Sequence, residues 1–251
     1  MKRTRLRLVL MVAVTASLAV VLVAGWVATA DGGDAPPETV RYVRPAGDKF
    51  VTECEFVIAR DGSGWSITSR TDRGATMLVV EARYDAEDCL TGAKAELSDG
   101  GSARVVTVKV KDGRANVERA GAAAAEFDVP KGTIVTSAPD WSDVFLLCRR
   151  YDRTRKEKQE FPALWIHPGQ RARRLTFSVE WLGADRVERD GKGVELGRYR
   201  IRIRDGSAYA AWADAEGVLV RLIPLPTKGT APGITREGHE KAAAGLRPTD
   251  R

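Results

Sequence analysis

The side chains that most often carry catalysis are scarce in this chain. It has two histidines, His167 and His239, and only His167 belongs to a regularly patterned region, in Trp-Ile-His-Pro-Gly at the end of an alternating run. No Gly-x-Ser-x-Gly nucleophile motif accompanies it, and His, Cys, Asp and Glu show no metal-ligand spacing. We therefore expect no enzyme, metal or cofactor, and a hydrolase centred on His167 is only the third hypothesis.

The three cysteines, Cys54, Cys89 and Cys148, can form at most one disulfide bond. If a bridge forms, we expect Cys54–Cys89, because Cys148 lies in the apolar run Leu-Leu-Cys, where a thiol is usually buried as a small hydrophobic group. No Cys-x-x-Cys pair is present, which argues against a redox or structural zinc site.

Aromatic side chains are the strongest candidates for binding. Five of the six tryptophans, together with one phenylalanine, lie in the patterned part of the chain and would supply a large apolar surface. The predicted ligand-binding residues are Trp65, Trp141, Phe145, Trp165, Trp181 and Trp212. The alternative is that these rings fill the core, which is the commoner use of buried aromatic side chains.

Arginines repeat at every second position in one run, which is a candidate anionic surface made of Arg198, Arg200, Arg202 and Arg204. On a strand, these side chains would project from one face about 7 Å apart and could meet phosphate head groups or an acidic partner. The alternative is a solvated face paired with carboxylates such as Glu180 or Glu195. The same two interpretations apply to the basic segment 149–158, for which the partner would be an anionic membrane surface.

Period two dominates the body of the chain. Val106, Val108 and Val110 alternate with polar residues, as do the runs 175–181 and 198–204. Asp-Gly dipeptides, which favour tight hairpin turns, stand beside these runs at five places. The pattern predicts a mainly β fold: an antiparallel meander of about ten strands between Asp48 and Leu225, with one face on a core and one in water.

One segment breaks this rhythm and predicts a short helix over 139–151. Ser137 is a candidate N-cap with Asp140 three residues on, and an apolar stripe then repeats at three- and four-residue spacing. The stripe consists of Trp141, Val144, Phe145, Cys148 and Tyr151. We expect it to cover the concave face of a curled sheet as a lid or a plug.

The first thirty residues predict export. Lys2, Arg3, Arg5 and Arg7 precede an uncharged run, Leu8–Ala30, that ends in Ala-Thr-Ala. It is typical of a cleaved signal peptide or, since about twenty apolar residues span a bilayer, of an uncleaved membrane anchor. Either interpretation places the domain in the periplasm or on the outer face of the cytoplasmic membrane.

The remaining boundaries follow from composition. We expect a linker over 31–47, the β domain over 48–226 and a loosely ordered tail over 227–251. The net charge of +6 is mostly the leader's, because four of the 40 Lys and Arg lie there, which leaves 36 against 34 acidic residues. That balance argues against a nucleic-acid partner.

The stretch from Tyr209 to Arg221 has a Trp followed by a turn, a Gly and a strand that ends in a proline. It resembles the closing hairpin of exported bacterial proteins of unknown function that are related in fold to the periplasmic lipoprotein carriers. The resemblance implies a half-barrel with one helix near its middle.

Two functions follow as expectations. The first is non-catalytic binding of an apolar or amphipathic ligand, such as a lipid or an acylated protein, in the concave sheet. The second is a protein-interaction module of the cell envelope, anchored in the membrane through Leu8–Ala30 and using the arginine-rich face. The oligomeric state does not follow from the sequence.

Overall fold

The computed structural model describes residues 36–60, 62–137, 141–203, 206–225 and 233–248. The predicted leader, Leu8–Ala30, lies outside these residues. Within them, no helix is both long enough and apolar enough to cross a membrane.

The described domain is mainly β, as predicted. Fifteen strands form a single sheet, antiparallel except where β9 pairs with β10 in parallel. The first eight form a meander: β1 (Glu38–Ala46), β2 (Lys49–Arg60), β3 (Gly64–Arg73), β4 (Thr76–Asp85), β5 (Leu90–Asp99), β6 (Ser102–Lys111), β7 (Arg114–Arg119) and β8 (Ala125–Asp128). The others are β9 (Ile134–Thr136), β10 (Gln159–His167), β11 (Gln170–Arg189), β12 (Lys192–Ile203), β13 (Ala208–Ala213), β14 (Leu219–Leu225) and β15 (Ile234–Arg236).

Alternation and turn chemistry produce these strands, as the sequence predicted. On β6, Val106 and Val108 are buried in the core, while their neighbours are less buried. Asp112 and Gly113, between β6 and β7, both have positive φ (51° and 71°), which a tight two-residue hairpin turn requires. The Trp-containing stretch that ends the predicted meander also forms a hairpin, made of β13 and β14.

The prediction of about ten strands was wrong, and so were the linker over 38–46 and the loosely ordered tail over 233–248; the rest of the predicted linker up to residue 35 and the tail residues 227–232 and 249–251 lie outside the described residues. The segment predicted as linker contains β1, in which Val40 and Tyr42 are buried and Arg41 between them is exposed. The segment predicted as tail contains β15, which is too short to show a period of its own. It forms because it pairs with β1 on one side and β14 on the other.

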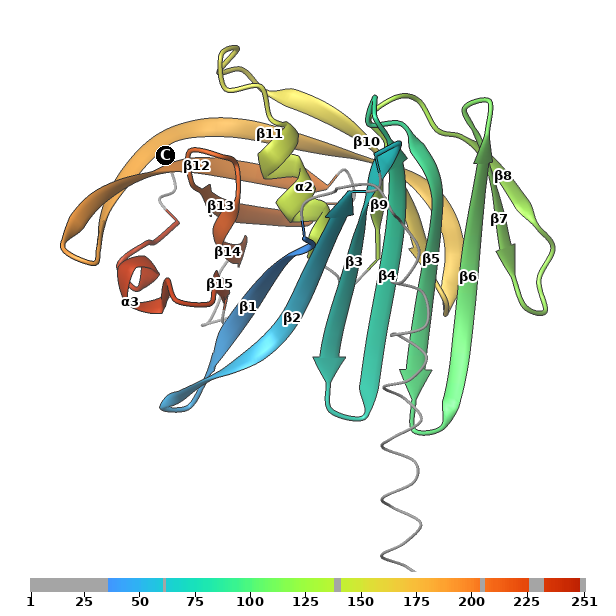
Figure 1. The fold of residues 1–251 in the computed structure, drawn as a ribbon, viewed down its shortest axis with the longest axis horizontal. Coiled ribbons are helices and arrows are strands. Elements are labelled where there is room, and N and C mark those ends of the chain that lie inside the picture. The colour runs from blue at the N-terminus through green and yellow to red at the C-terminus, as the bar shows by residue number, and fades with distance from the viewer. Residues whose placement is uncertain (1–35, 61, 138–140, 204–205, 226–232, 249–251) are drawn as a thin grey trace, which may run out of the picture. The chain divides into compact units, whose positions relative to one another are not determined.

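The pairing of β1 with β15 places the two ends of the domain in the middle of the sheet and leaves β8 and β9 as its edges. The sheet curls around the helix α2 (Figure 1). Side chains connect β7 and β8, at one end of the sheet, to β11, near the other end: Arg174 Nη1 lies 3.7 Å from Asp128 Oδ2, and Arg119 Nη1 donates to the carbonyl oxygen of Gln170 at 2.7 Å. Among the described strands, no backbone ladder joins the edge strand β8 to the edge strand β9, so the sheet is not closed.

The predicted helix is confirmed as α2 (Ser142–Arg150). Its N-cap position is Trp141, with no capping side chain, so the prediction of Ser137 as the cap was wrong; Pro139 and Asp140 lie outside the described residues. Phe145 is fully buried and packs on Phe56 of β2, with ring centres 5.8 Å apart. The apolar stripe of α2 therefore fills the core inside the curled sheet.

A second, smaller core lies on the opposite face of the sheet. Trp212 belongs to it, whereas its neighbours Ala211 and Ala213 belong to the main core, because successive side chains on a strand point to opposite faces. Leu246 and Ala243, from the short helix α3 (Glu240–Ala243) and the residues after it, cover this face. The C-terminal segment is thus part of the packed domain.

Candidate functional site

The structure does not gather the six predicted aromatic residues into one site. Phe145 is enclosed in the main core and Trp212 in the second core, where its Nε1 donates to Asp185 at 2.7 Å. Two core positions on opposite faces of a sheet cannot line one cavity. For these two residues, the structure places the rings where the alternative interpretation expected them.

Trp65 fastens α2 to the sheet. Its ring stacks on that of Tyr84 with centres 4.4 Å apart, and its Nε1 donates to Asp88 at 2.8 Å. The guanidinium of Arg150, at the end of α2, lies 5.6 Å from the Trp65 ring and 4.7 Å from the Tyr84 ring. This cluster holds one end of the helix in place.

Trp165 and Trp181 also have protein neighbours. Trp165 stacks on His167 at 6.2 Å and lies 5.4 Å from the guanidinium of Arg173. Trp181 meets Tyr199 edge-on at 5.3 Å and covers Gly197, where a Cβ would lie only 2.5 Å from its ring. Both rings therefore stabilise the sheet locally.

Trp141 differs from the other five because it lines an open cavity of about 930 Å³. Its ring meets that of Tyr209 edge-on at 5.7 Å, and its buried Nε1 has no hydrogen-bond partner among the described residues. Pro224 and Ile234 also line the cavity and, with Trp141, give it an apolar side. The cavity falls within the ~300–1,000 Å³ range of small-molecule sites.

A charged rim faces this apolar side. Glu53 is only 5% exposed and accepts hydrogen bonds from two arginines of neighbouring strands: Arg44 Nε at 2.6 Å, and Arg73 Nη2 and Nε at 2.8 and 3.1 Å. All three residues line the cavity. The β1–β2 register shifts at this point, since Tyr42 pairs with Cys54 but Val43 with Thr52, so Glu53 is the extra residue of a β-bulge.

Sequence reasoning missed this rim. On β2, the residues Lys49 to Thr52 are exposed, and the alternation of buried and less buried positions begins only at Cys54. A bulge cannot be located from one strand alone, because it is a mismatch between two strands.

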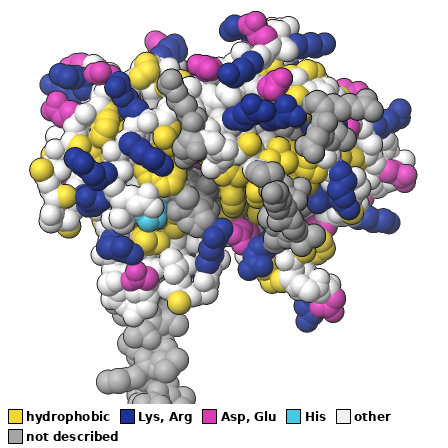
Figure 2. Space-filling view, turned by 180° about the vertical axis from the view of Figure 1, so that it is seen from behind, with side chains coloured by type: hydrophobic (Ala, Val, Ile, Leu, Met, Phe, Trp, Pro, Cys, Tyr) yellow, Lys and Arg dark blue, Asp and Glu magenta, His cyan; other side chains and the backbone are white. Residues whose placement is uncertain are grey.

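The β1–β2 hairpin beside the cavity carries exposed apolar side chains. Phe50 is 51% exposed and Val51 is 37% exposed, and Val51 also lines the cavity. The β1–β2, β3–β4 and β5–β6 hairpins all point to the same end of the sheet (bottom of Figure 1). On the face seen from behind, hydrophobic side chains gather near the centre, with Lys and Arg side chains spread around them (Figure 2).

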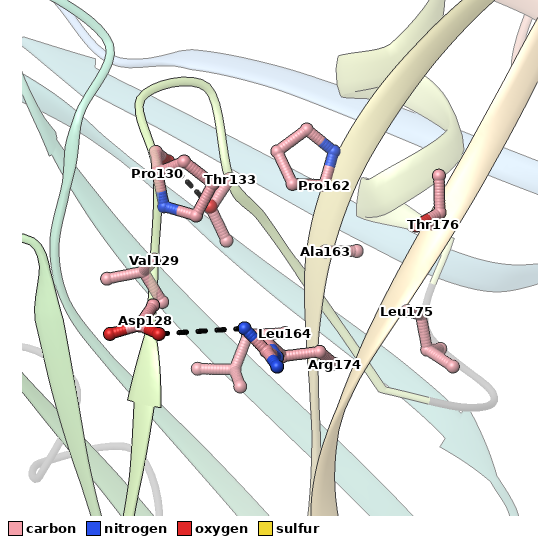
Figure 3. Close-up of a pocket in the computed structure, with 10 residues that line it drawn as sticks. All are labelled: Asp128, Val129, Pro130, Thr133, Pro162, Ala163, Leu164, Arg174, Leu175 and Thr176. Atoms are coloured by element: carbon pink, nitrogen blue, oxygen red, sulfur yellow. Dashed lines mark hydrogen bonds and ion pairs between the residues drawn. The ribbon is translucent and has the colours of Figure 1, made fainter.

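A second cavity, of about 620 Å³, lies between the end of β8 and the strands β10 and β11 (Figure 3). Pro130, Pro162 and Leu175 contribute to its lining, and the Asp128–Arg174 ion pair spans it. Because this ion pair joins the edge strand β8 to β11, near the other end of the sheet, the cavity lies where the curled sheet approaches itself.

The predicted arginine row is partly engaged within the domain. Arg198 Nη1 lies 3.5 Å from Asp185 and its Nη2 donates to the carbonyl of Leu182, while Arg200 pairs with Glu180 at 3.8 Å. Arg202 is exposed, and Arg204 lies outside the described residues. Glu180 is one of the two carboxylates that the sequence analysis named as partners for this row.

The basic segment 149–158 is similarly engaged. Arg153 donates to the backbone carbonyls of Asp214 and Ala215, Arg155 pairs with Glu157, and Lys158 lies 3.5 Å from Glu160. Arg149 is exposed. The cations of this segment mainly fix the loop that follows α2.

All three cysteines are free thiols, so the predicted Cys54–Cys89 bridge does not form. Cys54 lies level with Leu78 of β4, by way of Thr71, whereas Cys89 follows the far end of β4. Six strand residues at about 3.3 Å each put roughly 20 Å between those levels, while a disulfide needs Cα atoms within about 7 Å. Burial raises the pKa of Cys148 to about 12.

His167 lies at the end of β10 as predicted, and its Nδ1 accepts a hydrogen bond from the backbone N–H of Gly169 at 3.1 Å. Burial, and to a lesser extent Arg104, lower its pKa. His239 is buried, with its Nε2 2.8 Å from Arg189 Nη1. Within the described ranges, no three His, Cys, Asp or Glu side chains are grouped so as to hold a metal ion.

The chain matches no protein-family model and no curated protein. Three solved structures are similar in fold. A DUF1089 family protein from Pseudomonas aeruginosa is 16% identical, with 70% of this chain and 92% of that chain covered and a TM-score of 0.45. A beta-barrel-like protein of the domain of unknown function DUF1849 from Brucella abortus is 11% identical (80% and 93% covered, TM-score 0.48). The hypothetical lipoprotein YmcC from Escherichia coli is 13% identical (83% and 90% covered, TM-score 0.32). At these TM-scores, the likeness carries no argument about the function of this chain.

Proposed function

We propose that this protein is a non-catalytic protein of the cell envelope that binds an amphipathic ligand in the cavity beside Trp141. The observation that carries the proposal is the lining of that cavity. Trp141, Pro224 and Ile234 offer apolar surface, and Arg44, Arg73 and Glu53 offer charge, within one space of about 930 Å³. A ligand with an apolar chain and a polar head matches both parts.

Binding would be equilibrium capture. An alkyl chain that leaves water gains about 0.8 kcal/mol for each CH₂ that is fully buried. No covalent bond is made or broken, so binding requires neither a nucleophile motif nor a metal site.

Helix α2 acts in this proposal as a fixed plug. At its start, Thr136 Oγ1 donates to Asp143 at 2.5 Å, and at its end Arg150 Nη1 donates to the carbonyl of Gly132 at 3.1 Å. Seven consecutive helix residues, Ser142 to Cys148, are buried. Displacing the helix would expose all of this surface, so the ligand enters at the hairpin end, past Val51, and α2 stays in place.

The envelope location rests on the predicted leader. N-terminal sequencing of the mature protein tests it: a start at Asp31 indicates cleavage, and a start at Met1 or Lys2 indicates a retained anchor. The second hypothesis, an interaction module using the arginine row, has no specific observation in its favour, because Arg198 and Arg200 already have partners within the domain.

A titration with decyl maltoside, kept below its micelle concentration, tests the binding proposal. We expect saturable binding that Trp141→Ala weakens at least tenfold, because it removes the largest apolar ring in the cavity lining. Trp165→Phe is the control, since Trp165 is not part of that lining. Absence of binding to the wild-type protein, or an equal loss in both variants, would refute the proposal.

A further inference from the structure

We infer that the head group of the ligand is a single anion, such as a phosphate or a carboxylate, held between Arg44 and Arg73. This inference rests on the proposed function and adds the chemical class of the ligand. It starts from an arrangement on the rim of the cavity in which one buried carboxylate orients two guanidinium groups from different strands.

Glu53 orients the two guanidinium groups but accepts hydrogen bonds from only some of their N–H donors. Arg44 reaches it through Nε, and Arg73 reaches it through Nε and Nη2. Within the described part of the chain, both Nη atoms of Arg44 and Nη1 of Arg73 donate to no protein group. A guanidinium carries five N–H donors, so each arginine keeps donors for an oxyanion.

The carboxylate of Glu53 and the two arginines differ in solvent exposure. Glu53 is 5% exposed, whereas Arg44 is 41% exposed and Arg73 is 48% exposed. The carboxylate is thus enclosed beneath the two guanidinium groups, which remain accessible at the mouth. A ligand head meets cations first, and the acidic group that holds them lies behind.

The local charge favours a negatively charged head group on the ligand. Arg44, Arg73 and Glu53 together carry a formal charge of +1. Of the other charged side chains in the lining, Glu55 is paired with Arg41 at 2.6 Å, and the negative charge of Asp72 offsets the positive charge of Arg70, so the sum stays at +1.

The alternative is that the cluster only ties β1, β2 and β3 together at the bulge. That structural role would use the same hydrogen bonds, but it would not distinguish ligands by head-group charge. Charge selectivity at constant chain length is therefore the property to measure.

Three decyl amphiphiles, each below its micelle concentration, provide the test: decyl phosphate, decyl maltoside and decyltrimethylammonium. We expect decyl phosphate to bind at least tenfold more tightly than decyl maltoside, and the cationic amphiphile to bind most weakly. Equal affinity for the phosphate and the maltoside would overturn the inference while leaving the proposed function intact. If none of the three binds, the proposed function itself fails.

Variants locate the anion. Arg44→Gln and Arg73→Gln should each weaken decyl phosphate about tenfold and leave decyl maltoside unchanged. Arg60→Gln is the matched control, since Arg60 is exposed at the end of β2 and is not part of the cavity lining. A loss in the control equal to that in Arg44→Gln, or an equal loss for both ligands, would contradict the inference.

Inorganic phosphate distinguishes a head group from a free anion. We expect inorganic phosphate to compete with decyl phosphate only at concentrations at least a hundredfold higher, because it lacks the chain that contacts Trp141. Competition at equal concentration would show that the two arginines form a site for free anions, and the amphiphile inference would be wrong.

Discussion

The guanidinium of Arg150 lies 4.7 Å from the centre of the Tyr84 ring, so the last residue of α2 is fastened directly to β4. The contact matters because α2 fills the inside of the curled sheet. The same guanidinium also lies 5.6 Å from the Trp65 ring and donates to the carbonyl oxygen of Gly132. The Arg150 side chain therefore connects the end of the helix to three residues.

Arg150→Ala should lower the free energy of unfolding by about 1–3 kcal/mol, because it removes a largely buried cation–π contact and a hydrogen bond to a backbone carbonyl. Urea unfolding, followed by circular dichroism, measures the change. Arg149→Ala is the control and should change stability by less than about 0.5 kcal/mol, since Arg149 is exposed. Equal effects of the two substitutions would contradict the fastening role.

Gly197→Ala should destabilise the domain by about 1–3 kcal/mol, because the added Cβ would lie 2.5 Å from the Trp181 ring, which is packed against Tyr199. Gly193→Ala on the same strand is the matched control. Its Cβ would meet only the end of the flexible Arg186 side chain, at 2.6 Å, which can move away. Thermal unfolding of both variants tests the pair, and a larger loss in Gly193→Ala would refute the argument.

Stability should fall as the pH falls below about 6.5, and His239 should contribute to this fall. Burial lowers its pKa in the folded state, Arg189 and Arg236 lower it further, and the backbone carbonyl of Glu237 and Asp214 oppose them. The unfolded chain then binds a proton more readily than the folded one. The contribution is therefore complete above the unfolded pKa of about 6.5 and is lost as the pH falls towards the lowered folded pKa.

Urea midpoints at pH 7.5 and pH 5.5 check this prediction. His239→Gln should reduce the difference between the two midpoints, because it removes the titrating ring. His167→Gln should reduce it as well, since the pKa of His167 is also lowered. A wild-type midpoint that is higher at pH 5.5 than at pH 7.5, or a difference unchanged in both variants, would show that the sign is wrong.

The thiols should differ in reactivity. Cys89 is half-buried, whereas Cys54 and Cys148 are buried and burial raises the pKa of Cys148 to about 12. Because the thiolate is the reactive form, a thiol reagent at pH 8 should modify one cysteine in the folded protein and all three in urea. Cys89→Ser should abolish the reaction of the folded protein; rapid modification of that variant would contradict the described burial.

The strands, the hairpins and one helix were predicted from the pattern of neighbouring residues in the sequence. Val106 and Val108 alternate with polar residues, Asp112 and Gly113 tolerate positive φ, and the apolar stripe of α2 repeats at helical spacing. Each signal lies within a few consecutive residues, so it could be read without knowing which strands become neighbours. The same locality explains why β15 was missed, because three residues show no period.

The candidate site was less predictable. Trp141 was among the predicted residues, but so was Trp212, which occupies the opposite face of the sheet. Glu53, Arg44 and Arg73 come from three strands, and Glu53 is the residue at which β1 and β2 shift register in a bulge. The sequence pattern of a single strand does not show a register shift between two paired strands.

The sequence alone therefore determined most of the strands and turns, though not β1 or β15, because side-chain alternation and turn chemistry act between adjacent residues. Only the tertiary structure decided which face of each strand is covered, where the open cavity lies and which charges meet at its rim. These features depend on the order and register of strands that are far apart in the chain, and on the bulk of α2 inside the curled sheet.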